Sequence, residues 1–499
     1  MTGGDLGVPP IRVHGVNERP LAADGDYVLY WMIAQRRTRW NFGLQRAIEE
    51  ARRLGKPLVV LEALRCGYRW ASDRLHRFVL DGMRDNLARF DAAGIRYLPY
   101  LERKAGEGSG LLEALASRAA LVVTDEFPCF FLPAMVRAAG SRLDVRLEQV
   151  DGNGLLPLRA AEKPYPTAYS FRRHLQKTLP DHLSVSPEPE PLADVGDLGG
   201  AELPPEVEDR WSFCTAEELA DPGLQAGCEI DHEVGPVELE GGSVAGELRM
   251  EAFLDSRLDR YGERNQPEAD AASGLSPYFH FGHVSAHEVA FRALEREGWS
   301  PDDLAETTKG KREGWWGAQP ATEGFLDELI TWRELGYGFA FHRPDDYDSF
   351  SGLPDWARAS LEKHALDERE YLYSLEDFAA ARTHDELWNA AQRQLLREGV
   401  IHNYLRMLWG KKILEWTRSP QEAFEVMVEL NNRYALDGRN PNSYSGISWT
   451  LGRFDRPWAP ERPVFGVIRF MSSQNTARKL RVKGYLERYG TSTPGLFPA

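Results

Sequence analysis

The first part of the chain alternates short apolar runs with longer amphipathic stretches. Five runs rich in β-branched and aromatic residues predict β-strands, at residues 27–31, 57–63, 95–101, 120–125 and 145–151. Between them, apolar residues recur every three to four positions, which predicts helices over residues 41–54, 75–93 and 110–119. Strands and helices that alternate in this way form a parallel sheet with helices on both faces. No G-x-G-x-x-G motif follows the first strand, so the pattern does not support a standard dinucleotide site there.

The second part of the chain has a helical pattern almost throughout. Its predicted helices include residues 250–261, 286–297, 325–341, 385–398, 401–416 and 420–433. We therefore expect a Rossmann-like α/β domain with a parallel sheet, followed by a larger all-α domain. The expected boundaries are a loose tail over 1–25, the α/β domain over 26–151, a linker over 152–249, the helical domain over 250–490 and a C-terminal tail over 491–499.

The linker changes composition along its length. A basic helix is predicted over residues 169–178, with Arg172, Arg173, His174 and Lys177. An acidic segment rich in proline and glycine follows it, over residues 186–243. Such a composition buries little apolar surface, which leaves two alternatives: a long ordered wrap or a partly disordered loop.

The net charge of −16 is concentrated in this acidic segment. Residues 186–243 hold 16 Asp and Glu against a single basic residue, Arg210, whereas residues 431–499 hold 11 Lys and Arg against 4 Asp and Glu. The total charge would argue against a nucleic-acid partner, but its distribution leaves a basic C-terminal face that can meet phosphates. A basic face that is merely solvated is the alternative.

Length and cysteine content narrow the class of protein. A chain of 499 residues exceeds what a single core usually accommodates and is long enough to bury a large cofactor. The four cysteines are widely spaced without a C-x-x-C motif, which argues against a disulfide scaffold, a zinc ribbon or a cysteine-ligated iron–sulfur cluster. No signal-peptide layout and no membrane-length apolar run is present in the sequence, so we expect a soluble cytoplasmic protein.

Tryptophans are spaced along the predicted helices of the second part. Trp409 and Trp416 are seven residues apart on one helix, which places them on one face about 10 Å apart. That distance is long for one fast electron hop, and Trp388 on the preceding helix is the candidate for an indole between them. For the spacing alone, core packing is the more common explanation. Arg406 and Asp437 nearby favour instead a route for electrons to a redox cofactor.

Several long motifs occur in order in this helical part. They read S-G-L-S-P-Y-F-H-F-G-H-V-S at 273–285, F-L-D-E-L-I-T-W-R-E-L at 325–335, L-N-N-R-Y-A-L-D-G-R-N-P-N-S-Y-S-G-I-S-W at 430–449, F-D-R-P-W at 454–458 and E-R-P-V-F-G-V-I-R-F-M-S at 461–472. With them the chain resembles the photolyase/cryptochrome flavoproteins, and within these the class II cyclobutane pyrimidine dimer photolyases, from about residue 26 to residue 489. The resemblance implies a light-driven DNA-repair lyase. Its helical domain would hold reduced FAD (FADH⁻), which donates an electron to a dimer flipped out of the duplex.

The resemblance also implies the residues that bind the flavin. Ser273 and Ser276 match the family's phosphate segment, where a helix start suits a pyrophosphate, although helix capping also explains such serines. Arg406 and Asp437 match an ion pair beside the isoalloxazine. On the sequence alone either Asn431 or Asn432 could face flavin N5, and the motif register selects Asn431. The full predicted flavin set is Tyr261, Ser273, Leu275, Ser276, Arg406, Asn431, Asp437 and Gly438.

Four further positions match the family's substrate pocket. Glu328 matches a buried acid that stays protonated to donate a hydrogen bond to the dimer, although a lone Glu on an amphipathic helix is usually a surface residue. Trp332, on the same helical face, and Trp449 match two indoles that contact the flipped bases. Met407 matches a methionine that packs against the dimer. With Asn431, these residues form the predicted catalytic set.

Electron transfer and DNA contacts complete the predicted site. The resemblance assigns photoreduction of the flavin to Trp388, Trp409 and Trp416, with Trp409 innermost. Candidate DNA contacts are Arg264, Arg439, Arg453, Arg456 and Lys479, each of which could equally be a solvated surface residue. The sequence departs from the family at Phe454, where histidine is common, and this makes the neighbouring DNA-contact loop less certain than the flavin pocket.

Other functions are compatible with parts of the pattern. A cryptochrome-type blue-light receptor would share the flavin and the tryptophans but would need none of the four pocket residues. A (6-4) photoproduct lyase would be expected to carry a histidine pair at its lesion pocket, and none is seen beside Met407 or Trp449. A plain nucleic-acid-binding module would not need the flavin residues.

The family also implies an antenna chromophore, more usually a deazaflavin than a folate. We expect a monomer that binds dimer-containing DNA, with no metal and no membrane partner.

Overall fold

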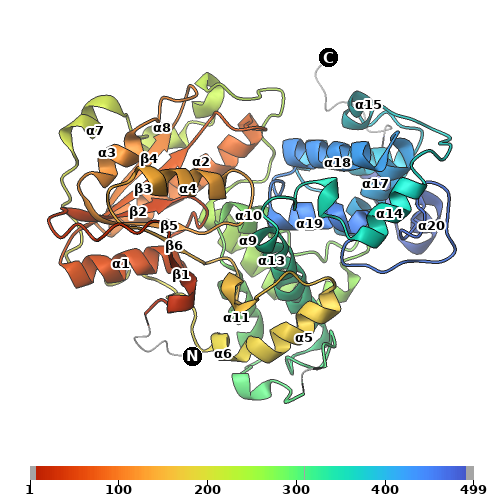
Figure 1. Ribbon diagram of the computed structural model, residues 1–499, viewed down its shortest axis with the longest axis horizontal. Coiled ribbons are helices and arrows are strands. Elements are labelled where there is room, and N and C mark those ends of the chain that lie inside the picture. Colours follow the sequence, from red (N-terminus) through yellow and green to blue (C-terminus); the bar gives the residue numbers. More distant parts are fainter. Residues whose placement is uncertain (1–6, 308, 491–499) are drawn as a thin grey trace. The chain divides into compact units, whose positions relative to one another are not determined.

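The structure is a computed structural model that describes residues 7–307 and 309–490. Its internal contacts divide the chain into two compact units (Figure 1). The sheet unit holds the residues up to Glu162, with His174–Glu251 and Gly274–Glu306. The helical unit holds Lys163–Arg173, Ala252–Ser273 and the chain from Thr307 onward. The unit boundaries differ from the predicted domain boundaries. Residues 174–249, which were predicted to be part of the linker, belong to the sheet unit.

The sheet unit is built on six strands. They are β1 (Val13–Gly15), β2 (Tyr27–Met32), β3 (Leu58–Leu64), β4 (Arg96–Leu101), β5 (Ala119–Asp125) and β6 (Leu147–Val150). Their order is β1-β6-β5-β2-β3-β4, and all neighbours are parallel except β1 and β6. The five predicted strands and the parallel sheet are confirmed. The prediction of a loose tail over residues 1–25 is wrong for β1, which pairs with β6 through Val13 and Val150.

Amphipathic helices close the faces of this sheet. The main ones are α1 (Phe42–Leu54), α2 (Asp73–Ala92), α3 (Leu111–Ala116) and α4 (Leu132–Arg142). The Asn41 side chain caps α1 by accepting hydrogen bonds from the first backbone amides, and Gly55 ends it with a φ of 61°. Phe42 of α1 and Phe90 of α2 share one apolar core with Val60 of β3, so both helices cover the same face.

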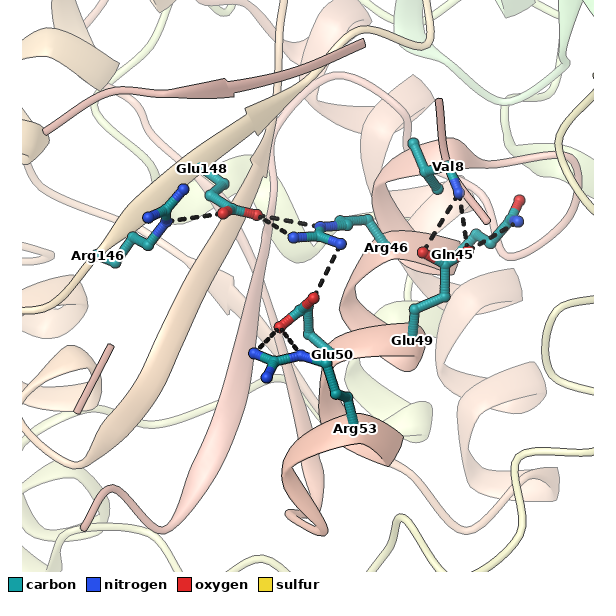
Figure 2. A network of polar contacts seen from close by, with 8 residues as sticks. All are labelled: Val8, Gln45, Arg46, Glu49, Glu50, Arg53, Arg146 and Glu148. Carbon is teal, nitrogen blue, oxygen red and sulfur yellow. Dashed lines mark hydrogen bonds and ion pairs between the residues drawn. The ribbon is translucent and has the colours of Figure 1, made fainter. Parts of the chain in front are cut away.

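A network of charged residues ties α1 to β6 (Figure 2). Arg46 bonds Glu148 of β6 at 3.1 Å and Glu50 of its own helix at 2.9 Å. Arg53 and Arg146 add second partners to these two buried carboxylates. Because each buried acid has two arginine partners, neither charge is left uncompensated.

The acidic segment 186–243 is an ordered wrap around the sheet unit, which decides between the two predicted alternatives. It contains α7 (Pro205–Arg210), α8 (Ala216–Ala220) and η3 (Leu224–Gly227). The Leu198 carbonyl accepts a hydrogen bond from the Leu58 amide at 2.8 Å, and the Cys214 amide donates to the Pro99 carbonyl at 2.8 Å. Leu219 is buried in a small apolar core, so the segment adds hydrophobic contacts as well as charge.

Further elements before residue 307 belong to one unit or the other. They are η1 (Pro10–Arg12), η2 (Leu158–Ala160), α5 (Ala168–Thr178), α6 (Pro180–Leu183), α9 (Gly242–Ser256), η4 (Leu258–Glu263), α10 (Ser276–Phe281), α11 (Ala286–Glu295) and η5 (Pro301–Asp303). The predicted basic helix is α5, and its arginine Arg172 is buried.

The helical unit continues from residue 320 as a bundle of helices. They are α12 (Pro320–Leu326), η6 (Asp327–Trp332), α13 (Arg333–His342), η7 (Phe350–Gly352), α14 (Asp355–Lys363), α15 (Leu375–Ala379), α16 (Glu386–Glu398), α17 (Asn403–Trp416), α18 (Pro420–Tyr434), α19 (Pro441–Thr450), α20 (Ser473–Lys479) and α21 (Lys483–Tyr489). Helix α17 packs against α16, α18 and α19, and α13 crosses α19. At the crossing, a Cβ on Gly336 would lie 2.3 Å from the Asn442 side chain, so this close approach requires glycine.

One predicted helix is interrupted. The pattern predicts a regular helix over residues 325–341, but η6 within it is a π-helix. Such wide turns are rare and occur often at functional sites. No helix among the described residues has the length and the apolar composition required to cross a bilayer.

Candidate functional site

Three tryptophans of the helical unit form a continuous aromatic chain. The ring of Trp388, on α16, lies 6.5 Å from Trp409 and 6.0 Å from Trp416, measured between ring centroids. The Trp388 and Trp409 rings are parallel to within 3°, and Trp416 is inclined to Trp388 by 69°. All three indoles are buried. The predicted position of Trp388 between the two indoles of α17 is confirmed, and its role in electron transfer stays a prediction.

The inner two indoles have their polar atoms satisfied inside the protein. Trp388 Nε1 donates to the Trp409 carbonyl at 3.0 Å, and Trp409 Nε1 donates to Gln392 Oε1 at 2.9 Å. Trp416 instead lies beside the Lys412 ammonium, 5.2 Å from its ring centroid, and beside the ring of His384 at 5.0 Å. The two ends of the chain therefore differ, since the Trp416 end has polar and ionisable neighbours.

The predicted ion pair of Arg406 and Asp437 is present. Their closest nitrogen and oxygen atoms are 3.0 Å apart, and both side chains are partly buried. Arg406 precedes Trp409 by one turn of α17, so the charge pair and the innermost indole share a helix face. The following Gly438 permits a tight return of the chain, because a Cβ there would lie 2.7 Å from the Asn431 carbonyl oxygen.

The structure distinguishes the two neighbouring asparagines of α18. Asn432 is committed to the fold, because its Nδ2 donates to the Tyr444 hydroxyl at 3.1 Å and its Oδ1 accepts from the Arg439 amide at 2.7 Å. The buried Asn431 makes a long contact of 3.4 Å from its Nδ2 to Asn432 Oδ1. Asn431 is therefore the better placed of the two to turn its amide toward a cofactor, in agreement with the motif register.

Two of the predicted DNA contacts are corrected by the structure. Arg439 is buried, and its guanidinium donates to the carbonyls of Asn432 and Ala435 at the end of α18. Arg453 is also buried and donates to the Gly352 carbonyl through Nε at 2.9 Å, and burial lowers its pKa to about 10. Both guanidinium groups donate to backbone carbonyls inside the protein, so neither is available to a phosphate. The motif could not predict these contacts, because every residue has a backbone carbonyl and the sequence does not indicate which one accepts a hydrogen bond.

The other predicted DNA contacts reach the surface of the helical unit. Arg456 is exposed, with its guanidinium 4.6 Å from the Trp458 ring centroid. Lys479 is also exposed and lies 5.1 Å from the centroid of the Tyr404 ring. Such cations beside aromatic rings suit contact with nucleic acid, but their role stays a prediction.

Glu328 differs from its prediction. It was expected to be a buried, protonated acid, but its side chain is 32 % exposed and accepts a bond from Arg264 at 2.9 Å. The Arg264 guanidinium also stacks 4.7 Å from the Tyr261 ring centroid. Glu328 is therefore paired with a cation and can be reached from solvent. Arg264, predicted to contact DNA, is thereby the direct neighbour of the predicted catalytic acid.

The remaining pocket residues lie on three helices of the helical unit. Trp332 ends η6, Met407 lies on α17 and Trp449 on α19, and all three side chains are half-buried. The Trp449 ring centroid is 5.6 Å from the ammonium of the buried Lys411 and 5.9 Å from the guanidinium of Arg469. A half-buried indole beside two cations can stack a base and still be reached from solvent.

Phe454, the departure from the family motif, is buried. Its ring meets the ring of Phe339 edge-on, with 5.8 Å between centroids. Its backbone has a φ of 65°, a left-handed conformation that is strained for an aromatic residue. Phe454 therefore packs inside the protein and offers no side chain to DNA.

The predicted phosphate segment, residues 273–285, begins at the point in the sequence where a stretch of the helical unit ends and a stretch of the sheet unit starts. Ser273 is half-buried, Leu275 is buried, and Ser276 is exposed at the start of α10. Tyr261, on η4 of the helical unit, is buried, and this burial raises the pKa of its hydroxyl.

An arginine that the motif reading missed lies beside this segment. A Cβ on Gly274, which has a φ of 68°, would fall 2.9 Å from Nε of Arg249 on α9. That Nε is buried without a hydrogen-bond partner in the structure. A buried and unsatisfied guanidinium nitrogen next to a serine-bearing loop suits an anionic ligand. Arg249 stands more than twenty residues before the serines and outside any motif, so no sequence pattern indicated it.

Known proteins similar to the chain are named as photolyases. No protein-family model matches it. A deoxyribodipyrimidine photo-lyase of Methanothermobacter thermautotrophicus is 35 % identical over 481 residues, covering 96 % of this chain and 97 % of the relative. One from Arabidopsis thaliana is 34 % identical over 494 residues, with 94 % and 90 % covered. Among solved structures, a bacterial class III photolyase from Agrobacterium tumefaciens has a TM-score of 0.66 at 17 % identity and covers 93 % of this chain and 86 % of its own. This last likeness concerns the fold alone.

Proposed function

Because the chain belongs to the deoxyribodipyrimidine photo-lyase family, we propose that it splits cyclobutane pyrimidine dimers in DNA in a light-driven reaction of the class II type. The observation that carries this proposal is the content of the helical unit. It holds a contiguous tryptophan chain, a partly buried Arg–Asp pair and the four pocket residues of a dimer lyase. A receptor that only senses light has no need of the pocket residues.

The residues present fit FAD. Arg249, with its unsatisfied Nε beside Gly274, supplies a positive charge near Ser273 and Ser276 that suits a pyrophosphate. Arg406 and Asp437 would flank the isoalloxazine, and Asn431 would offer its amide to the ring. When bound, reduced FAD supplies one electron from its light-excited state and takes that electron back after the two carbon–carbon bonds have broken. The reaction is therefore redox-neutral overall.

The pocket residues have the remaining tasks. Trp332 and Trp449 would contact the flipped bases through their ring faces, which stabilises the extruded dimer by about 1–3 kcal/mol per base. Met407 would fill the space beside the dimer with a polarizable apolar side chain. Exclusion of water by these three side chains strengthens every electrostatic contact inside the pocket.

Glu328 would act at the base carbonyl on which negative charge develops. In the ligand-free protein it accepts a bond from Arg264, so the dimer must either share this pair or displace it. If the pair opens, the Glu328 carboxyl group can stabilise the base carbonyl by donating a hydrogen bond, which requires the neutral acid. If the pair is shared, the Arg264 guanidinium can itself stabilise the developing charge.

The tryptophan chain would restore the reduced state of the flavin between repair events. Trp409 is three residues from Arg406, Trp388 lies in the middle, and Trp416 ends beside Lys412 and His384. Electrons that enter at Trp416 can thus reach Trp409 through two ring contacts. This recharging route is separate from repair, which uses an electron already on the flavin.

Other parts of the proposal concern partners. We propose that dimer-containing DNA is approached by a surface that includes Arg456 and Lys479, that the protein acts in the cytoplasm as a monomer, and that an antenna chromophore, more usually a deazaflavin in this family, binds the sheet unit. A cryptochrome-type receptor is the second candidate. The aromatic chain fits it equally well, and the four pocket residues weigh against it.

An absorption spectrum and a repair assay test the proposal. The purified protein should show flavin bands, and an additional near-ultraviolet band would identify an antenna. After chemical reduction, near-ultraviolet light should convert a thymine-dimer oligonucleotide to its unmodified form, with chromatography as the readout. A (6-4) photoproduct oligonucleotide is the matched control and should remain unchanged. Flavin photoreduction without any dimer repair would support the receptor instead.

A further inference from the structure

The residue before Glu328 is an acid that the proposed chemistry does not use. Asp327 is buried, and its two carboxylate oxygens receive bonds from Arg172 at 2.7 Å and 3.0 Å. Arg312 adds a bond to the same carboxylate at 3.2 Å. Asp327 therefore has one bidentate partner and a second partner with a longer bond, and all three residues lie within the helical unit.

Arg172 reaches Asp327 from a distant part of the sequence. It lies on α5, in the stretch Lys163–Arg173 that belongs to the helical unit, and it is itself buried. Its Nη1 also donates to the Gly310 carbonyl at 3.3 Å. Burying such a pair costs desolvation energy on both partners, so an apolar pair of similar volume would often be as stable. An apolar pair could not replace the two directed hydrogen bonds, which fix the orientation of the Arg172 and Asp327 side chains relative to each other.

The pair acts on an unusual helical turn. Asp327 is the first residue of the π-helix η6, which contains Glu328 and ends with Trp332. π turns are rare and occur mostly as single turns inside α-helices, often at functional sites, so contacts that hold this turn in place bear on function. Successive side chains of one helical turn point in fixed directions relative to each other, so the direction of Asp327 fixes that of Glu328. Asp327 points to Arg172 and Glu328 points to Arg264, so two arginines from different segments hold neighbouring acids of one turn.

We propose that Arg172 is a positioning residue for the substrate pocket: it clamps Asp327 and thereby fixes the π-helical turn that presents Glu328 and Trp332 to the dimer. This inference rests on the proposed function. Arg172 touches neither dimer nor flavin in this scheme and acts only through Asp327. The clamp makes the linker segment around residue 172 part of the repair apparatus.

The test compares substitutions at the two arginines that share Asp327. Arg172→Met should lower the repair yield per absorbed photon of reduced, flavin-loaded enzyme by about tenfold, since small misplacements of a reacting group have effects of this size or larger. Arg172→Lys, which keeps the charge but loses the bidentate geometry, should recover part of the yield. Arg312→Met is the matched control, because its side chain is 57 % exposed and makes the longer bond, and it should change the yield less than twofold. Photoreduction through the tryptophans should stay normal in all three.

A double substitution and hydrogen exchange separate positioning from ordinary stability. The double variant Arg172→Met/Asp327→Asn should have a repair yield no lower than that of the weaker single variant. The two effects do not add, because both substitutions remove the same contact. Hydrogen exchange at the backbone amides of residues 327–332 should accelerate in Arg172→Met and not in Arg312→Met. A wild-type yield in Arg172→Met, or unchanged exchange at these amides, would overturn the clamp. The exchange readout does not require repair, so if wild-type enzyme repaired no dimers, the proposed function would fail while the clamp itself was still tested.

Discussion

The indoles of Trp388 and Trp409 are parallel to within 3°, and the N–H of the first donates a hydrogen bond to the backbone carbonyl of the second. This arrangement joins two helices, α16 and α17, by one ring contact and one hydrogen bond. It also fixes which indole is the middle member of the chain, because Trp388 contacts both Trp409 and Trp416.

We expect Trp388→Phe to abolish most of the photoreduction of oxidised flavin. Without the middle indole, Trp409 and Trp416 are separated by seven residues of helix, about 10 Å. Repair by chemically reduced enzyme should be nearly unchanged, as it should be in Trp409→Phe. Flavin absorbance under continuous light is the measurement. Trp211→Phe, at a buried indole of the sheet unit, is the control; wild-type photoreduction in Trp388→Phe would show that electrons take another route.

Glu328 should influence repair yield and leave flavin binding unchanged. Glu328→Gln keeps the shape and can both accept from Arg264 and donate to the dimer carbonyl, so the yield per photon should fall modestly. Glu328→Ala leaves both the dimer carbonyl and Arg264 without this partner, and the yield should fall further, with roughly 3 kcal/mol as an upper limit for one such contact. Actinometry with a dimer oligonucleotide gives the yields. Flavin loss in both variants would place Glu328 in the cofactor site instead.

DNA binding should be sensitive to salt despite the acidic total charge. If about three or four phosphates are neutralised, the slope of log affinity against log salt is about −3. Substituting glutamine for the exposed acids Glu202, Glu206, Glu217 and Glu238 should leave the affinity for damaged duplex unchanged or stronger. Fluorescence anisotropy over a salt series measures both quantities. A large loss of affinity in the folded variant would show that the acidic segment takes part in binding.

Lys411 should make stability depend on pH. Burial lowers the pKa of its ammonium to about 7, below the ordinary value of 10.5, so the unfolded chain binds more protons than the folded one between these values. The free energy of unfolding should therefore rise with pH in this window, by at most about 1.4 kcal/mol per pH unit. Lys411→Met should lose this contribution to the slope in urea titrations at pH 7, 8 and 9. Equal slopes in both proteins would mean that Lys411 keeps its proton when folded.

The sequence was sufficient for the sheet and for most of the helices, since apolar periodicity records burial on a regular element. It could not show β1, whose three residues are too few to form a period, or the π turn at Asp327–Trp332, which preserves the apolar pattern of an α-helix. The family resemblance paired Arg406 with Asp437, and the helical spacing of Trp409 and Trp416 led to Trp388 as the indole between them; the structure shows both contacts. Arg439 and Arg453 were misjudged because their partners are backbone carbonyls. The role of Arg172 was missed because its partner Asp327 lies far away in the sequence, and Arg249 was missed because it stands outside the motifs.

The acidic segment has a consequence for how the protein behaves at high concentration. Strand β4 is one edge of the sheet, and the Cys214 amide bonds the Pro99 carbonyl in the middle of that strand. The opposite edge is β1, a strand of only three residues. A long bare edge is a template on which other chains can add strands, and a short strand, a proline or a covering segment blunts it. A variant that lacked residues 186–243 would therefore be expected to self-associate through β4, and the strong negative charge of the segment should further hold molecules apart.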